Sequence, residues 1–191
     1  MQKYFVGLVA LFFPVIAFNA EFVVDPCPAG SISIPASTPS DQFTETNYVV
    51  TDNKTGLMWS RCAYGYSWNV SGAKCLDDSS VVSLVDWATA LQVASDTDTS
   101  GGTGALFGYN DWRLPNLKEL TSIIERQCRS LSINYAVFPG APGGEYWTNT
   151  HVLNKYPANA LIIRTIDFSG GNLSEASPAS LRYLRLVRDA N

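Results

Sequence analysis

The sequence contains few of the side chains on which most catalytic and metal centres depend. Among 191 residues there is one histidine, His151, and the four cysteines form no Cys-x-x-Cys pair. Zinc sites draw mainly on such cysteines and histidines, so zinc explains these cysteines poorly. A Ser-His-Asp triad would have to use His151, and no Gly-x-Ser-x-Gly turn accompanies it. We therefore predict that the protein is not an enzyme and has no catalytic residues.

Basic residues are also scarce, since 13 Lys and Arg stand against 17 Asp and Glu, giving a net charge of -4. Binding to nucleic acid needs clustered Lys and Arg that neutralise phosphates. We therefore expect no nucleic-acid partner.

A long apolar run occurs only at the beginning of the chain, where residues 4–18 follow Lys3. The run is too short to span a bilayer stably, and the small residues Ala17 and Ala20 offer cleavage sites at its end. We predict that residues 1–20 are a signal peptide, with an uncleaved anchor as the alternative. Because Lys3 is the one charged residue among them, removal changes the net charge from -4 to -5. We expect a periplasmic, surface or extracellular protein with no membrane span after this removal.

The cysteines fit such an exported protein, because disulfides form in oxidising compartments. Four cysteines allow three pairings, and their spacing favours a short Cys62–Cys75 loop, which leaves Cys27 to pair with Cys128. In the loop-entropy description, the two closures contribute about 3 and about 4.7 kcal/mol respectively.

The remaining sequence divides at about residue 46. Residues 21–46 are rich in Pro, Ser and Thr, and Pro35 and Pro39 argue against regular structure, so we predict a tethered N-terminal arm. Residues 47–191 read as one folded domain. Its strand-like segments are residues 48–51 and 57–59, which flank turn residues 52–56 as a hairpin, and residues 145–150, 160–168 and 181–188, with a turn at 169–172.

Two helices are expected between these strands. Ser83 is the predicted N-cap of the first, with Asp86 at its third position, and the helix should fade at residues 96–102. Asn116 and Glu119 form a capping-box pattern for the second. Its apolar face is Leu117, Leu120, Ile123, Ile124 and Cys128. Two helices among short strands predict an α+β fold with a small, mostly antiparallel sheet.

Four segments together resemble a known family. They are Thr51–Trp59, then Asp111–Asn116 with Glu119-Leu120, then Ile133-Asn134 with Phe138-Pro139 and Tyr146-Trp147-Thr148, and lastly Leu184–Arg188. This combination resembles the bacterial Lcl C-terminal domain, long catalogued as a domain of unknown function. The resemblance implies a C-type-lectin-like fold. It also implies a link to adhesion, since related domains end a collagen-like surface adhesin that binds host glycans.

Calcium is the one cofactor that the sequence leaves open; otherwise we expect none. Asp96, Asp98 and Ser100, followed by Gly101, have the first half of a calcium loop. Position 12 of that loop would be Phe107, so the bidentate Glu is missing. The Glu-Pro-Asn and Gln-Pro-Asp triplets of calcium-dependent lectins are also absent, and we predict a flexible polar turn without metal.

Two segments are candidates for ligand binding. Tyr64, Tyr66 and Trp68 lie inside the predicted disulfide loop, where aromatic rings offer contact area at low entropic cost. A later polar stretch offers amide and aromatic groups to sugar hydroxyls: Tyr146, Asn149, Asn154, Tyr156 and Asn159. The alternatives are a local hydrophobic plug for the first segment and a solvated loop for the second. Core positions are expected for Trp59, Trp112 and Trp147.

These observations predict a secreted or surface-exposed binding module whose partner is a glycan or a cell-surface protein. The alternative is a structural or capping subunit of a surface assembly, and an oxidase or hydrolase on a lectin-like fold comes third. The oligomeric state cannot be read from the sequence.

Overall fold

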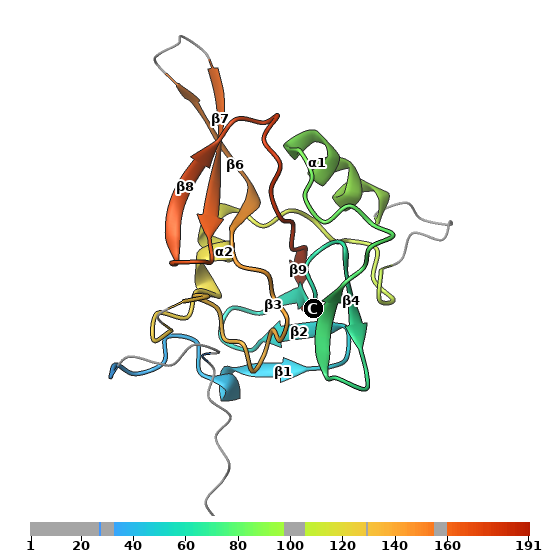
Figure 1. The fold of residues 1–191 in the computed structure, drawn as a ribbon, viewed down its shortest axis with the longest axis vertical. Helices are drawn as coiled ribbons and strands as arrows, with labels where there is room; N and C mark the ends of the chain where they lie inside the picture. Colours follow the sequence, from blue (N-terminus) through green and yellow to red (C-terminus); the bar gives the residue numbers. More distant parts are fainter. Residues whose placement is uncertain (1–26, 28–32, 98–105, 129, 155–159) are drawn as a thin grey trace, which may run out of the picture.

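The computed structural model describes Cys27 and residues 33–97, 106–128, 130–154 and 160–191. These residues form the predicted α+β fold, in which the strand pairs within sheets are all antiparallel (Figure 1). In chain order the elements are η1 (Ser40–Gln42), β1 (Phe43–Glu45), β2 (Val49–Asp52), β3 (Leu57–Ser60), β4 (Tyr66–Asn69), β5 (Lys74–Asp77), α1 (Trp87–Asp96), α2 (Leu117–Ser122), β6 (Glu145–Asn154), β7 (Ala160–Asp167), β8 (Asn172–Ala176) and β9 (Val187–Asp189).

The largest sheet has the order β1-β2-β3-β9, so the last strand of the chain lies beside the first hairpin. The predicted hairpin at residues 48–59 is confirmed as β2 and β3. Val50 pairs with Trp59, and Trp59 pairs with Val187. All three side chains are fully buried in one cluster, whereas Val49 and Met58 on the opposite face are buried in another. A slip of one residue would exchange the two sets, which fixes the register.

A second sheet has the order β6-β7-β8, with the predicted turn at residues 169–172 joining β7 to β8. Strand β6 extends beyond the predicted segment to Asn154. The register of its pairing with β7 shifts between Trp147 and His151. The prediction of a continuous strand over residues 181–188 is wrong. Only β9 is a strand there, and Arg182 and Tyr183 make isolated bridges to Val85 and Tyr146. The preceding residues pair with no single strand, because their backbone partners change along the segment. The carbonyls of Leu184 and Leu186 accept from the amides of Tyr64 and Ser60, whereas Tyr183 pairs beside Trp147.

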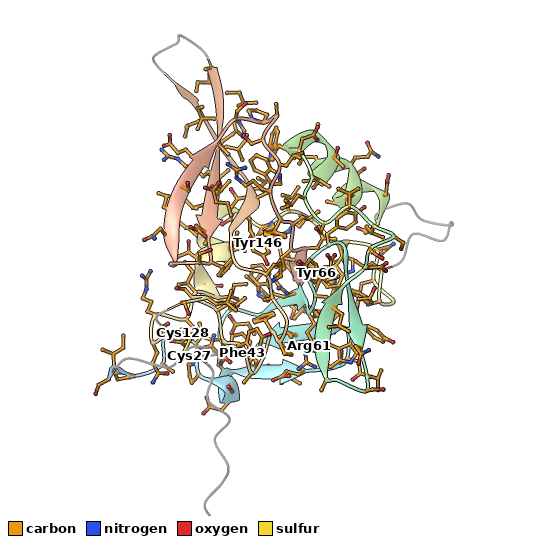
Figure 2. The ribbon with its side chains drawn as sticks, in the orientation of Figure 1. Cys27, Phe43, Arg61, Tyr66, Cys128 and Tyr146 are labelled. Carbon is orange, nitrogen blue, oxygen red and sulfur yellow. A yellow bond between two sulfur atoms is a disulfide. The ribbon has the colours of Figure 1, made fainter. Side chains whose placement is uncertain are left out.

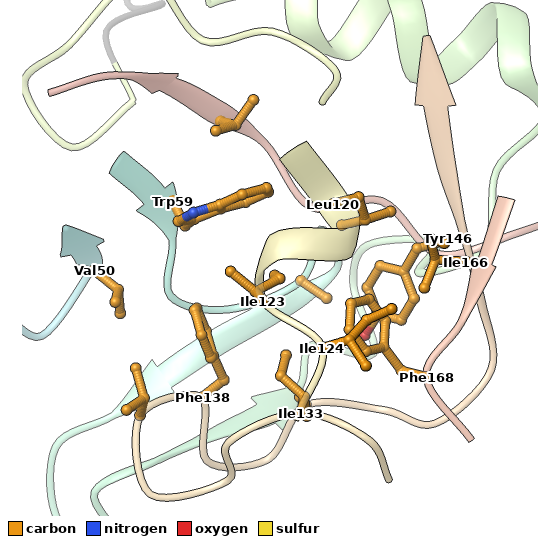
Figure 3. Packing of buried hydrophobic residues seen from close by; sticks show 14 of the residues in the cluster. Val50, Trp59, Leu120, Ile123, Ile124, Ile133, Phe138, Tyr146, Ile166 and Phe168 are labelled. Carbon is orange, nitrogen blue, oxygen red and sulfur yellow. The ribbon is translucent and has the colours of Figure 1, made fainter. Parts of the chain in front are cut away.

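The first cluster lies between the four-stranded sheet and α2. Trp59, Leu120, Ile123 and Phe138 meet at its centre, and each is fully buried (Figure 3). The second cluster contains Trp112, Trp147, Ala90 and Leu184. The expected core positions of the three tryptophans are therefore confirmed.

Both helices are short, and each corrects the sequence prediction at one end. The N-cap of α1 is Asp86, which accepts a hydrogen bond from the Thr89 amide at 2.7 Å. Ser83 does not cap it, because Val85 pairs with Arg182 and keeps the chain extended up to the helix.

The capping box of Asn116 and Glu119 is confirmed in α2. This helix ends at Ser122, and the predicted apolar face does not continue helically to Cys128. Ile124 instead forms a β-bridge with Ile133, so its side chain reaches the core from a non-helical segment.

The predicted arm is wrong in its C-terminal part. Residues 40–45 form η1 and β1, and β1 is the outer strand of the four-stranded sheet. Pro39 is compatible with this, because its φ of -63° suits the residue before η1. Both predicted disulfides are present, Cys27–Cys128 and Cys62–Cys75, and Figure 2 shows Cys27 beside Cys128.

A buried carboxylate fastens the same segment to the body. Glu125 is fully buried and accepts hydrogen bonds from the amides and hydroxyls of Ser37 and Thr38 and from the Gln127 amide, at 2.8–3.1 Å. Burial alone would raise the pKa of Glu125, but these donors outweigh it and hold the pKa below its usual value of 4.5.

We predict that Glu125→Gln lowers the free energy of unfolding at neutral pH by about 2–4 kcal/mol, because several charge-assisted hydrogen bonds are lost. A carboxyl with a lowered folded-state pKa stabilises the protein above its unfolded value, and this contribution disappears as the pH falls below about 4.5. The difference between wild type and variant should therefore shrink under acid in urea unfolding curves. A difference that stays constant with pH would show that Glu125 does not act as a carboxylate.

Candidate binding pocket

Five aromatic residues from three separate segments line one pocket. Its volume is about 330 Å³, and one wall is the segment that carries the predicted ligand residues. The full set of lining residues is Tyr48, Cys62, Tyr64, Gly65, Tyr66, Ser67, Trp68, Asp78, Val81, Leu106 and Phe107. The three aromatic residues predicted from the sequence are therefore brought together in one concavity.

The first wall is a hairpin, where the sequence suggested a loop. Strands β4 and β5 pair with Trp68 opposite Cys75, and the Cys62–Cys75 disulfide ties β5 to the chain entering the hairpin. The Arg61 guanidinium lies 4.2 Å from the centre of the Trp68 ring and pairs with Glu45. Figure 2 shows Arg61 and Tyr66 on this side of the molecule. Trp68 is thus held by a cation–π contact as well as by the strand pairing.

Gly65, at the start of the hairpin, packs closely against the backbone of Ser83. Its φ of +78° favours glycine, and a Cβ there would lie 2.6 Å from the Ser83 Cα. Its carbonyl accepts a hydrogen bond from the Asp78 amide at 2.8 Å. This close approach brings Asp78 and Val81 to the pocket.

The opposite wall depends on the buried Trp112. Its indole N–H donates to the Leu106 carbonyl at 2.8 Å, and its ring contacts Phe107 edge-to-face at 6.3 Å between centroids. Phe107 in turn stacks on Tyr48, with 5.2 Å between centroids and 11° between ring planes. Phe107 also has a φ of +57°, which is unusual for a side chain of this size. Strain of this kind is retained where the surroundings fix the geometry, as Trp112 does here.

Asp78 is the charged residue among those that line the pocket. Its Oδ1 accepts from the Ser80 hydroxyl at 2.6 Å and the Ser80 amide at 3.1 Å, and its Oδ2 accepts from the Ser67 hydroxyl at 3.0 Å. These donors, those of Ser80 foremost, lower the pKa of Asp78 and keep it ionised.

The pKa of Tyr66 is shifted upwards, in the opposite direction to that of Asp78. Burial, together with the neighbouring Tyr183 and Asp77, raises the pKa of Tyr66 to about 12. Its phenol therefore stays neutral, and it hydrogen-bonds with Tyr183. The pocket combines aromatic faces, a hydroxyl of Ser67 and one carboxylate.

The residues of the second predicted segment do not line the pocket, and they differ in burial. Tyr146 is not on the surface: it is buried in the first cluster, and its hydroxyl donates to the Pro142 carbonyl at 2.9 Å. The prediction of Tyr146 as a ligand residue is therefore wrong: polar residues follow it, but Tyr146 itself lies in the part of β6 that faces the core. Asn149 is exposed, and Asn154 is the last residue of β6. Tyr156 and Asn159 lie outside the described residues.

His151 is exposed on β6, with its ring 6.2 Å from that of Trp87. Of the suggested calcium ligands, Asp96 ends α1 and accepts a hydrogen bond from the Gln92 amide group at 2.6 Å. Asp98 and Ser100 lie outside the described residues. Within the described part of the chain, no group of three His, Cys, Asp or Glu residues could hold a metal ion.

Tyr48, Asp78 and Phe107 are among the lining residues that the sequence did not predict. Tyr48 was assigned to a strand, and Phe107 was considered only as a missing calcium ligand. Neither has a local signal, because the pocket depends on a tertiary contact between them. Asp78 follows a strand within a polar run, which is the pattern of an ordinary turn.

The sequence profile of the Lcl C-terminal domain matches residues 48–188, which include β2 to β8, both helices and the pocket. The chain belongs to the Lcl C-terminal domain family. No curated protein and no solved structure is significantly similar to it. In this Lcl C-terminal domain, the matched region contains Trp112, the residue that supports the pocket wall. None of the helices described is long and apolar enough to cross a membrane.

We predict that Trp112→Ala destabilises the protein by about 3–5 kcal/mol, because it empties a core position and frees the Leu106 carbonyl. Trp112→Phe should cost less, since it retains much of the packing and removes only the indole hydrogen bond. Chemical unfolding of both variants provides the measurement. An alanine variant with wild-type stability would contradict the buried position of Trp112.

Gly65→Ala should destabilise the protein by about 2 kcal/mol or more, from its positive φ and the contact with Ser83. Gly56 is the matched control, because its φ is +71° and a Cβ there meets nothing within 4 Å. Gly56→Ala should show the cost of the conformation alone, about 1–2 kcal/mol. Equal losses in thermal unfolding of the two variants would show that residues 65 and 83 are not in close contact.

Proposed function

We propose that this protein is a secreted or surface-exposed binding module that holds a glycan in the aromatic pocket and catalyses no reaction. The observation that carries the proposal is the meeting of Tyr64, Tyr66 and Trp68 with Tyr48 and Phe107 around one concavity. Apolar walls with a few placed polar groups are the usual composition of a small-molecule site.

A sugar ring suits these walls. It has an apolar face that can lie on an aromatic ring, and hydroxyls at its edge that need hydrogen-bonding partners. Ser67 and Asp78 line the pocket and provide oxygen acceptors for such hydroxyls. Aromatic walls also reduce the entropic cost of binding because their side chains have few rotatable bonds.

The fold and the compartment are part of the same proposal. A C-type-lectin-like fold is supported by family membership and by the pairing of β9 with β3, which brings both ends of the domain into one sheet. Export is supported by the apolar run near Lys3 and by two disulfides.

A capping subunit that binds protein is the second candidate. It is favoured by the exposed side chains of Leu153 and Leu173 on β6 and β8, which are 67% and 54% exposed. Such residues can contribute to a protein interface, although single exposed leucines are common on surfaces.

A glycan array followed by calorimetry tests the proposal. Tyr48→Ala and Phe107→Ala should each weaken binding of a glycan found on the array by at least about tenfold, since aromatic contacts at a binding site are worth 1–2 kcal/mol or more. The folding of Tyr48→Ala should be little affected, because this side chain is 48% exposed.

Leu173→Ala is the control, because Leu173 is exposed on β8 and does not line the pocket. It should bind like wild type. A blank array, together with capture of an envelope protein that binds Tyr48→Ala equally well, would replace the glycan proposal with the capping subunit.

A further inference from the structure

We infer that the pocket selects a glycan that carries a free, protonated amino group over neutral and sulfated glycans. This inference rests on the proposed function and names the ligand class for the same pocket. It is carried by the position of the Asp78 carboxylate at the edge of the aromatic walls.

The charge of the pocket is the first argument. Asp78 is the only charged side chain among the lining residues described, and no ion pair to it occurs within the described part of the chain. The nearby Arg61 does not offset it, because that guanidinium faces Trp68 and pairs with Glu45. The pocket therefore favours a cation and repels sulfate.

The Asp78 carboxylate also has room for another donor. Its two oxygens offer about four acceptor sites. Ser67 and Ser80 occupy three of them: two donors go to Oδ1 and a single donor to Oδ2. A ligand ammonium can therefore bind at Oδ2 without displacing the internal hydrogen bonds.

The aromatic walls strengthen the preference. The faces of tyrosine, tryptophan and phenylalanine rings attract cations, and the attraction grows as water is excluded. Tyr66 adds no positive charge and remains a neutral phenol, and Asp77 lies close enough to affect it electrostatically.

A volume of about 330 Å³ is at the small end of ligand sites, which span about 300–1,000 Å³. This suits one or two sugar units rather than a long chain.

The test compares three probes by isothermal titration calorimetry at mildly acidic pH. They are a short chitosan oligosaccharide with protonated amines, its fully N-acetylated counterpart of equal length, and a heparin oligosaccharide. Asp78 stays ionised under these conditions because its pKa lies below the usual value. The amino form should bind about tenfold more tightly than the acetylated form, from one ion pair and one cation–π contact. Heparin should not bind.

Asp78→Asn should remove most of the preference for the amino form while leaving binding of the acetylated form nearly unchanged. Asp167→Asn is the matched control, because Asp167 caps the β7–β8 turn and does not line the pocket. It should retain the full preference.

The outcomes separate this inference from the proposed function. Equal binding of the amino and acetylated forms, abolished by Tyr48→Ala, would overturn the amino-group selection and leave glycan binding intact. Preference for heparin would overturn the charge argument. Failure of all glycans to bind would overturn the proposed function itself. Binding of tetramethylammonium as tightly as the oligosaccharide would overturn the assignment to a sugar.

Discussion

The buried guanidinium of Arg185 is the constraint on which the remaining packing depends. It is fully buried, donates to the carbonyls of Ser60 and Arg61, and lies 4.7 Å from the centre of the Phe138 ring. Burial lowers the pKa of Arg185, and interaction with the Tyr146 phenol partly offsets this effect. Leaving such a cation without these partners would be costly, so the residues around it have few alternative arrangements.

Arg185 also joins the two hydrophobic clusters to the pocket. Its neighbours Leu184 and Leu186 belong to the second cluster, whereas Phe138 belongs to the first. The Leu184 carbonyl accepts a hydrogen bond from the Tyr64 amide at 2.8 Å, which places a pocket residue directly on this segment. The opposite wall is fixed by Trp112 in the family signature. The aromatic residues of the proposed binding site are thus positioned by buried groups that do not line the pocket, as a preorganised site requires.

The sequence predicted the features that depend on local chemistry. The capping box of Asn116, the hairpin at β2 and β3 and the two disulfides follow from residue types at short spacing or from elimination among few choices. The features it failed to predict depend on tertiary contacts. β1 follows residues that Glu125 holds against the body, and α2 is followed by a bridge between Ile124 and Ile133. The pocket was half predicted, since its first wall is contiguous in sequence and its second wall requires Phe107 to meet Tyr48.

The central claim is that the ligand binds where these walls meet. A ¹H–¹⁵N correlation spectrum recorded during titration with a chitosan oligosaccharide tests it most directly. The account predicts that the Trp68 indole signal and the amides of Gly65, Asp78 and Phe107 shift together, while those of Asn149 and Leu173 remain in place. Shifts concentrated on the β6-β7-β8 sheet, with the pocket signals unchanged, would contradict it.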